Sequence, residues 1–293
     1  MIKLSINGCE VNHSSHSFSD GATGVKLISA VPVRPETALI TVLSNGKVNE
    51  ELFEVASIVS LLRDLRSNIR IDLYIPYTPY ARQDRRMVRH DAFSLKVYAN
   101  LLNSLNLSRV YVLDSHSGVA PALINNCVEI PQDFVLQELT NMYPRSENNL
   151  VIISPDLGAV KKASKAVDVF GAQGISYLNK VRDPATGQIT KLSLFGGNTG
   201  IKGKNLLIVD DLCDGGGTFI QAAQYLKQFE PASIDLYVTH GIFSRDIQIL
   251  RNNGIDLIFS TDSIKHPDNG LSTSGLSRFS CERIYNKWVG IER

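Results

Sequence analysis

The sequence contains few cysteines and no long apolar segment. Its four cysteines are scattered over 293 residues, and none of them forms a CxxC pair or a tight zinc-ligand spacing. Few, unpatterned cysteines in a chain of this length favour a reducing cytoplasm over a disulfide framework. No apolar run approaches the ~20 residues that a membrane-spanning helix needs. The first residues also lack the basic and apolar parts of a signal peptide, so we expect a cytoplasmic protein with no membrane partner.

An excess of charge of either sign is also absent. Lys and Arg number 30, and Asp and Glu number 29, which gives a formal net charge of +1. A chain without a basic excess has no electrostatic reason to bind nucleic acid, so no nucleic-acid partner is expected. Hydrophobic residues make up 43% and charged residues 20%, which is typical of a soluble globular protein and excludes a disordered or fibrous chain.

Short apolar runs alternate with amphipathic stretches along the chain. Near-continuous apolar strands that alternate with helices are typical of mostly parallel sheets covered by helices, so the sequence predicts an α/β protein. The expected strands are 70–77, 109–116, 149–156, 204–211, 233–242 and 255–263. The expected helices are 50–67, 92–106, 159–170 and 217–229.

The alternating pattern runs twice, and several strands end in polar residues. A polar stretch near 135–148 separates the halves, so we expect one domain over 1–140 and a second over 141–293. The C-terminal residues 279–293 are a candidate for packing back on the first half. Since ligands gather at the carboxyl ends of parallel strands, the polar strand ends indicate where substrates bind.

The strongest local signal lies at 206–226, where an apolar strand, a glycine-rich loop and a helix follow one another. The strand ends in Asp210 and Asp211, and the loop runs from Asp214 through three glycines to Thr218. Glycines allow a tight turn and close approach of a ligand, and the loop N–H groups with the helix N-terminus suit a phosphate. The aspartates lie where sugar hydroxyls or a metal-bound water would be. The alternative is a glycine-rich turn in which Asp214 or Thr218 caps the helix.

This segment resembles the phosphoribosyl-diphosphate-binding loop of type I phosphoribosyltransferases and of ribose-phosphate diphosphokinases. Further segments favour the second family: FSDG (18–21), IPYTPYARQDRR (75–86), VYVLDSHS (110–117), VIISPDLGAVKKA (151–163), NKVRDP (179–184) and THGIFS (239–244). The resemblance runs in order from about residue 18 to residue 265. It implies two tandem phosphoribosyltransferase-like lobes, each a mostly parallel sheet flanked by helices. The N-terminal lobe would hold the ATP site and the C-terminal lobe the ribose-phosphate site.

The resemblance also implies a reaction. Enzymes of this family transfer the β,γ-diphosphate of ATP to the anomeric 1-hydroxyl of ribose 5-phosphate, which gives phosphoribosyl diphosphate and AMP. Attack at the β-phosphorus builds an anionic transition state, so positioning, Mg²⁺ and cationic side chains supply most of the catalysis. Mg²⁺ prefers oxygen ligands and keeps several waters, so few protein groups are needed to hold it.

The same resemblance assigns the metal site and the catalytic cations. His116 and Asp156 match the metal-site residues, and Lys180 and Arg182 match the cations that close over the transferring phosphates. The turn-rich stretch DPATGQ (183–188) follows and is expected to move as a lid. Without the resemblance, a lone histidine is a buried hydrogen-bonded side chain and a Lys-x-Arg pair is a solvated strand edge.

ATP is assigned to two segments, and the ribose phosphate to a third. The ATP-binding residues are Phe18, Asp20, Arg82, Gln83 and Asp84. The Phe18 ring can stack on adenine, the Asp20 carboxylate can accept a hydrogen bond from the adenine amine, and the planar guanidinium of Arg82 suits phosphate oxygens. Without the resemblance, RQDRR is a charged surface loop. The ribose-phosphate residues are Asp210 and Asp211 for the ribose hydroxyls, and Asp214, Gly215, Gly216, Gly217 and Thr218 for the 5-phosphate. In this family the segment around Phe18 reaches the adenine of a neighbouring subunit, which implies a homo-oligomer, a dimer or a hexamer.

Two positions depart from the family pattern. Ala22 stands where the family usually has Glu, and Gly215 stands where its loop commonly has Thr. Three alternatives to the leading function therefore remain. The same diphosphoryl transfer to ADP-ribose would serve NAD synthesis, a regulatory paralogue would keep the fold without catalysis, and a phosphoribosyltransferase would use a base as its second substrate.

Overall fold

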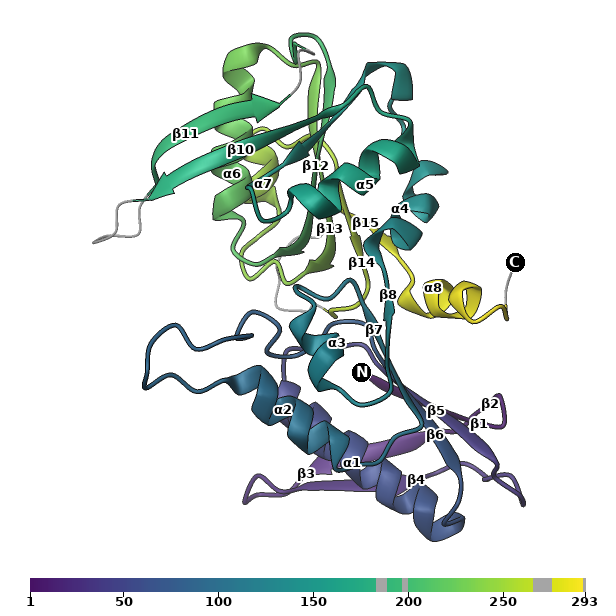
Figure 1. Cartoon of the computed structure of the whole chain (residues 1–293). Coiled ribbons are helices and arrows are strands. Elements are labelled where there is room, and N and C mark those ends of the chain that lie inside the picture. Colours follow the sequence, from purple (N-terminus) through teal and green to yellow (C-terminus); the bar gives the residue numbers. More distant parts are fainter. Residues whose placement is uncertain (183–188, 197–199, 266–275, 292–293) are drawn as a thin grey trace. The chain divides into compact units, whose positions relative to one another are not determined.

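The computed structural model describes residues 1–182, 189–196, 200–265 and 276–291, and the chain divides into two compact units (Figure 1). The first comprises Met1–Ile130 and Ser263–Pro267, and the second comprises Pro131–Asp262 and Asp268–Arg293. Each contains one mostly parallel sheet flanked by helices, so the expected α/β class is confirmed.

The sheet of the first unit is parallel in its centre and antiparallel at one edge. In spatial order its strands are β2 (Cys9–Glu10), β1 (Ile2–Ile6), β5 (Thr37–Val42), β6 (Arg70–Ile75), β7 (Arg109–Leu113) and β8 (Cys127–Ile130). Strands β5 to β8 run parallel, and β1 pairs antiparallel with both β5 and β2. The carboxyl ends of the parallel strands therefore share one edge, where the segments 76–84 and 114–117 begin.

Three helices belong to this unit: α1 (Val48–Leu65), α2 (Ser94–Asn103) and α3 (Val119–Leu123). In α1, Val55, Ile58, Val59 and Leu62 recur at helical spacing and are buried against the sheet. Each such buried side chain contributes about 1.5–3 kcal/mol relative to exposure. This apolar face explains why the sequence pattern found α1 within two residues of its ends.

A two-stranded hairpin, β3 (His13–Ser17) and β4 (Thr23–Leu27), forms a separate small sheet. It is attached to α1, since His13 Nε2 lies 2.9 Å from Glu54 Oε1. The hydrogen bond with His13 lowers the pKa of Glu54 below its ordinary value, despite the opposing effect of burial.

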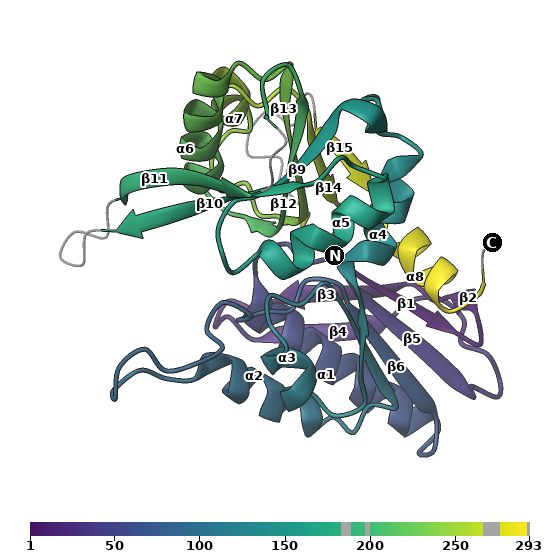
Figure 2. The ribbon, with the colours of Figure 1, turned by 45° about the horizontal axis from the view of Figure 1, so that its top comes forward.

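The sheet of the second unit has seven strands. In spatial order they are β11 (Ile189–Gly196), β10 (Ile175–Arg182), β9 (Leu150–Ser154), β12 (Asn205–Cys213), β13 (Ser233–Gly241), β14 (Ile258–Thr261) and β15 (Leu276–Phe279). All neighbours pair parallel except β10 and β11. Figure 2 shows these two antiparallel strands as a long ribbon at the sheet edge.

The second unit's helices are α4 (Gln132–Thr140), α5 (Val160–Phe170), α6 (Gly217–Leu226), α7 (Gln248–Asn252) and α8 (Cys281–Trp288), with short 3₁₀ turns η1 (Glu147–Asn149) and η2 (Lys227–Phe229). Helices α6 and α7 cover one face of the sheet, and α4 and α5 lie on the other (Figure 1). Every residue of β9 and β13 is buried, because helices cover both faces of the sheet.

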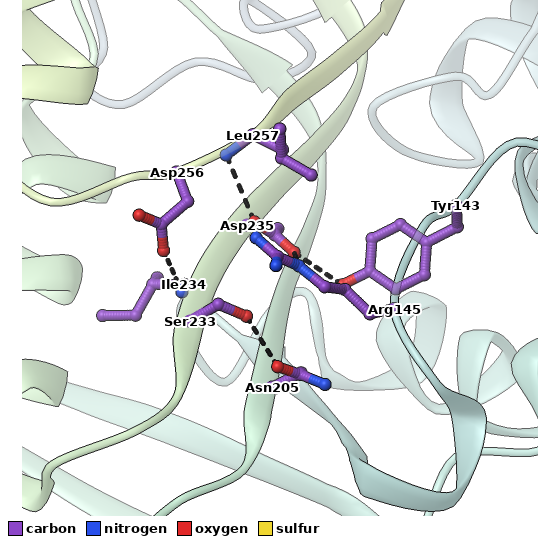
Figure 3. A network of polar contacts seen from close by, with 8 residues as sticks. All are labelled: Tyr143, Arg145, Asn205, Ser233, Ile234, Asp235, Asp256 and Leu257. Carbon is purple, nitrogen blue, oxygen red and sulfur yellow. Dashed lines mark hydrogen bonds and ion pairs between the residues drawn. The ribbon is translucent and has the colours of Figure 1, made fainter.

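The division between the units falls after Ile130, N-terminal to the 140/141 boundary expected from the sequence. The reason lies in the polar stretch that suggested the boundary. Figure 3 shows Tyr143 and Arg145 of that stretch bound to Asp235 of β13, with Tyr143 Oη 2.8 Å and Arg145 Nε 3.1 Å from Asp235 Oδ2. The stretch is thus anchored in the second unit.

The chain also returns once to the first unit. The N–H of Ser44, just after β5, donates to Ser263 O at 3.0 Å, and the N–H of Lys265 donates to Ser44 O at 2.6 Å. Helix α8, in contrast, belongs to the second unit. That residues 279–293 also pack on the first half stays a prediction.

The contacts of α8 explain its placement. Lys287 Nζ donates to Glu138 Oε1 of α4 at 2.6 Å, and the Trp288 ring meets the Phe134 ring edge to face at 5.0 Å. Within the described residues, no helix combines the length and the apolar character that crossing a membrane requires.

Candidate active site

In the first unit, the segments that follow β6 and β7 each contain a non-glycine residue with a positive φ. Tyr80 has a φ of +60°, in the turn after β6, and Asp114 has a φ of +40°, directly after β7. Positive φ is uncommon for non-glycine residues and gathers where surrounding structure enforces it, often at functional sites. Asp114 is buried, and its N–H donates to Ile130 O at 2.9 Å. These turns present the next residues, 82–84 and 115–117, at the carboxyl edge of the sheet.

A hydrogen bond joins the two segments. Ser117 Oγ donates to Asp84 Oδ2 at 2.7 Å, and Arg85 Nε donates to Asp84 Oδ1 at 3.0 Å. Burial raises the pKa of Asp84, but the bonds from Ser117 and Arg85 and the charge of Arg85 outweigh it, so the pKa lies below its ordinary value. Asp84 is therefore an ionised, buried carboxylate that holds the 82–84 loop against the 115–117 loop.

The exposed residues next to this bond are the expected ligand-binding ones. His116 precedes Ser117, and Arg82 and Gln83 precede Asp84; all three are exposed. The structure thus brings the expected metal-site histidine and two expected ATP-binding residues into one loop cluster. Sequence reasoning did not find the role of Ser117, because a hydrogen bond between positions 33 residues apart leaves no trace in spacing.

Phe18 and Asp20 lie elsewhere in the first unit, on the turn of the β3–β4 hairpin. Asp20 Oδ1 accepts from the N–H of Ala22 at 3.0 Å, which fixes the turn. The Phe18 side chain is 55% exposed, and its ring meets the His16 ring edge to face at 4.5 Å. A Cβ at Gly24 would lie 2.5 Å from the His16 ring, so glycine there leaves room for this pair. The exposed ring is available for stacking.

In the second unit, the expected ribose-phosphate residues lie at the end of β12. The strand continues to Cys213, so Asp210 and Asp211 are strand residues whose side chains point to opposite faces. Asp210 Oδ1 accepts from the N–H of Asp211 at 2.9 Å. Burial raises the pKa of Asp210 well above its ordinary value, and the charges of Asp211 and Asp156 add to the rise. Such crowded carboxyls suit a bound cation or hydroxyl donors.

The glycine loop leads directly into α6. Gly216 is the N-cap and has no side chain to cap the helix, so the N–H groups of the first turn face the loop. Its φ is +76°, and a Cβ there would lie 2.8 Å from Leu250 Cδ2, so only glycine fits. The arrangement is that of a helix N-terminus prepared for an anion.

Gln132, the first residue of α4, holds the end of β12 in place through hydrogen bonds. It is buried, and its Nε2 donates to Asp210 O at 2.9 Å and to Thr239 Oγ1 at 3.3 Å. It therefore links the ends of β12 and β13. Nothing in the local sequence marks this role, since the partners of Gln132 lie 78 and 107 residues away.

Asp156 follows β9 in the same unit. Its Oδ1 accepts from the N–H of Ala159 at 3.1 Å, and Ser154 Oγ donates to its carbonyl at 2.7 Å. The two expected metal residues, His116 and Asp156, thus belong to different units. In the described part of the chain, no group of three or more His, Cys, Asp or Glu side chains is arranged to hold a metal. Mg²⁺ typically takes only one or two carboxylates together with substrate phosphates, so the carboxylate of Asp156 is of a kind that Mg²⁺ accepts.

For Lys180 and Arg182, the structure describes only the backbone. Both lie on β10, where Lys180 pairs with Leu192 and Arg182 with Ile189 of β11. The register shifts between Val181 and Arg182, which marks a bulge or irregularity at the strand end. The expected lid, 183–188, lies outside the described residues.

Comparison with known proteins decides the family. The model of the N-terminal domain of ribose phosphate pyrophosphokinase matches residues 2–105, and the phosphoribosyl transferase domain model matches residues 134–260. The chain is 30% identical over 269 residues to the ribose-phosphate pyrophosphokinase of Maricaulis maris, covering 90% of this chain and 83% of that one. It belongs to the ribose-phosphate pyrophosphokinase family.

Other pyrophosphokinases agree. The Vibrio parahaemolyticus protein is 30% identical, with 91% of this chain and 83% of that one covered. The crystal structure of phosphoribosylpyrophosphate synthetase from Mycobacterium smegmatis has the same fold, with a TM-score of 0.78 at 21% identity over 96% of this chain and 91% of that one. The expected resemblance and the expectation of an enzyme of the pyrophosphokinase family are confirmed. A phosphoribosyltransferase that uses a base would leave residues 2–105 unexplained.

Proposed function

We propose that this protein transfers the β,γ-diphosphate of ATP to the anomeric 1-hydroxyl of ribose 5-phosphate in the presence of Mg²⁺. The bond between the α,β-bridging oxygen and the β-phosphorus breaks, and the 1-hydroxyl oxygen bonds to the β-phosphorus as its proton leaves. The products are AMP and phosphoribosyl diphosphate. Membership of the pyrophosphokinase family supports this chemistry. The end of β12 carries the proposal, because paired carboxyls are followed there by an open helix N-terminus.

The acceptor side of the reaction uses that region. The N–H groups of the loop and of Gly217 and Thr218 bind the 5-phosphate, whereas the N–H of Phe219 donates to Gly216 O at 3.0 Å. Asp210 and Asp211 accept hydrogen bonds from the ribose hydroxyls. Gln132 holds the main chain of Asp210 in place, so the sugar meets a fixed surface.

The ATP side uses the loop cluster of the first unit. Arg82 and Gln83 bind phosphate and nucleotide groups, and the partly buried Asp84–Ser117 bond keeps their loop in position. Phe18 and Asp20 contribute a ring and a carboxylate to adenine recognition. Because that hairpin ring is exposed, we propose that it serves the site of a neighbouring subunit, in a dimer or a hexamer.

Mg²⁺ would be held by His116 and Asp156 with phosphate oxygens and water. When bound, it supplies positive charge to the oxygens of the transferring diphosphate. Lys180 and Arg182 supply cationic groups to the charge that develops at the β-phosphorus. We place the enzyme in the cytoplasm, in nucleotide or NAD biosynthesis, without a nucleic-acid or membrane partner.

One observation favours a second acceptor. Gly215 lacks the side chain that the related loops commonly have, which removes a hydroxyl donor and widens the loop. An acceptor such as ADP-ribose, whose 5-phosphate is a diester, needs that room. The same diphosphoryl transfer to ADP-ribose is therefore the alternative function.

The direct experiment measures AMP release. The purified protein is incubated with ATP and Mg²⁺, with ribose 5-phosphate, with ADP-ribose, or with no acceptor. AMP release that depends on an acceptor and on Mg²⁺ supports the proposal. The absence of AMP with either acceptor would instead favour a non-catalytic regulatory paralogue.

A further inference from the structure

Gly216 and Gly215 of the phosphate loop are under different structural constraints. Gly216 requires its positive φ and the absence of a Cβ beside Leu250. Gly215 has neither constraint, because its φ lies outside the left-handed region and a Cβ there would keep 3.7 Å from its nearest neighbours. That distance is ordinary van der Waals contact. The fold therefore admits a side chain at position 215, and the chain leaves the space empty of one.

The space beside Gly215 faces a polar and a cationic side chain. Its missing Cβ would lie 3.7 Å from Ser244 Oγ and 3.7 Å from Arg245 Nε. Both residues are exposed. The open space at position 215 is thus bordered by a hydroxyl and a guanidinium, which are groups that bind phosphate oxygens.

The main chain fixes these two residues against the loop. The N–H groups of Ile242 and Phe243 donate to Cys213 O at 2.8 and 3.2 Å, and Phe243 has a φ of +43°. The turn after β13 is thereby fastened to the last residue of β12. The segment that carries Ser244 and Arg245 is consequently held beside the loop by hydrogen bonds, independently of any ligand.

Arg245 is also free to bind an anion. Among the described residues it has no ion pair and no side-chain hydrogen bond. The carboxylate next to it in sequence, Asp246, accepts from the N–H of Gln248, the first residue of α7, at 2.8 Å. A guanidinium with no acidic partner, beside a loop built for phosphate, has its planar fork available.

We infer that Ser244 and Arg245 form a second anion contact beside the loop, which binds the further phosphate of the alternative acceptor, ADP-ribose, and which ribose 5-phosphate does not use. This rests on the proposed function of the β12–α6 loop as the site of the 5-phosphate. The loop N–H groups bind the first phosphate, and the group attached to it leaves through the space at Gly215. The second phosphate then meets the fork of Arg245, which a monoester leaves unused.

The test compares binding of two ligands by calorimetry, without ATP: ribose 5-phosphate and ADP-ribose. In Arg245→Gln, we expect the affinity for ADP-ribose to fall about 10- to 100-fold, which is the effect of losing a hydrogen-bonded charge pair. The affinity for ribose 5-phosphate should change less than about threefold. Gly215→Thr, which fills the space, should weaken ADP-ribose selectively as well.

Arg251→Gln is the matched control, since Arg251 is an exposed arginine at the end of α7. It should leave the affinities for both ligands unchanged. Equal losses for both ligands in Arg245→Gln, no loss for either, or no binding of ADP-ribose to the native protein would each overturn the inference. Because binding is read without turnover, a selective loss upholds the inference even where AMP release fails. AMP release with ribose 5-phosphate alone upholds the proposed function independently.

Discussion

Gly216 and Gly203 make the role of the phosphate loop testable at the level of single residues. Both have positive φ, +76° and +69°, but a Cβ would clash only at Gly216, where Leu250 lies 2.8 Å away. Alanine in the left-handed region costs about 1–2 kcal/mol, so both alanine variants should lose similar backbone stability. Only Gly216→Ala should also displace the N-terminus of α6 and lower kcat/KM for the sugar phosphate, by at least about tenfold for one lost charged hydrogen bond.

Steady-state kinetics measures kcat/KM of the two variants, and thermal unfolding measures their stability. Gly203→Ala, in the turn before β12, is the control for strain without a clash. Equal kinetic effects in the two variants would mean that the loop at Gly216 does not bind the acceptor.

Lys180 and Arg182 are expected to act on the transition state. Charge at the β-phosphorus develops only there, so Lys180→Ala or Arg182→Ala should lower kcat about 10²–10³-fold and change KM little, by analogy with the loss of an oxyanion donor. Lys202→Ala removes an exposed lysine paired with Glu230 in the same unit and should be neutral. A raised KM with unchanged kcat would assign the two residues to substrate binding instead.

Single residues also show the limit of sequence reasoning. The phosphate loop was found because three consecutive glycines after an apolar strand leave few structural alternatives. The partly buried bond between Asp84 and Ser117 was not, and neither was the contact of Gln132 with Asp210. Such partners meet only through the tertiary fold, and nothing in their local sequence marks them.

At the level of elements, the Asp235 network ties the polar stretch after α4 to β13 (Figure 3). Asp235 is fully buried and accepts from Tyr143, Arg145 and the N–H of Leu257 at 3.2 Å. Burial raises the pKa of Asp235, and the bonds from Arg145 and Tyr143 only partly offset the rise. Arg145→Ala should therefore destabilise the second unit by about 3 kcal/mol at neutral pH, as expected for a broken buried ion pair.

The pH dependence of this effect has a definite sign. The folded pKa of Asp235 lies above the unfolded value of about 3.9, so the native state binds the proton more tightly. The cost of Arg145→Ala should shrink as the pH falls from 7 towards 4, because the carboxyl becomes neutral. Urea unfolding followed by Trp288 fluorescence measures it, since the chain's one tryptophan lies in this unit. Lys165→Ala, which loses a surface ion pair with Asp133 in the same unit, should cost under about 1 kcal/mol; an equally small, pH-independent effect for Arg145 would contradict the assignment.

The sequence predicted six of the strands, but it missed the central strand β5, where threonines interrupt the apolar run, and most of the elements at the sheet edges. Strands such as β9 and β13 are buried on both faces and therefore read as continuous apolar runs. The strand β3 (HSSHS) has four of its five residues exposed, so its sequence shows no alternation of apolar and polar residues. Helix α4 overlaps the polar stretch 135–148 that predicts a boundary, and α8 is short and charged. Peripheral elements depend on contacts such as Lys287–Glu138, which local patterns do not contain.

At the scale of the whole molecule, the exposed Phe18 turn predicts assembly. Its ring is 55% exposed and lies on a hairpin joined to α1 through the His13–Glu54 pair. If this turn completes the site of a neighbouring subunit, light scattering should give a mass that is a multiple of 32.3 kDa. Phe18→Ala should raise KM for ATP, whereas the exposed Phe53→Ala on α1 should not. A fully active monomer would refute the shared site.

Phosphorus NMR of the reaction tests directly whether the diphosphate is transferred as one group. With ATP, Mg²⁺ and ribose 5-phosphate, we expect AMP and phosphoribosyl diphosphate to appear in equal amounts, with ATP falling at the same rate. Formation of ADP with a ribose bisphosphate would mean that the γ-phosphate alone is transferred. That result, or AMP with free diphosphate and unchanged sugar, would contradict the account.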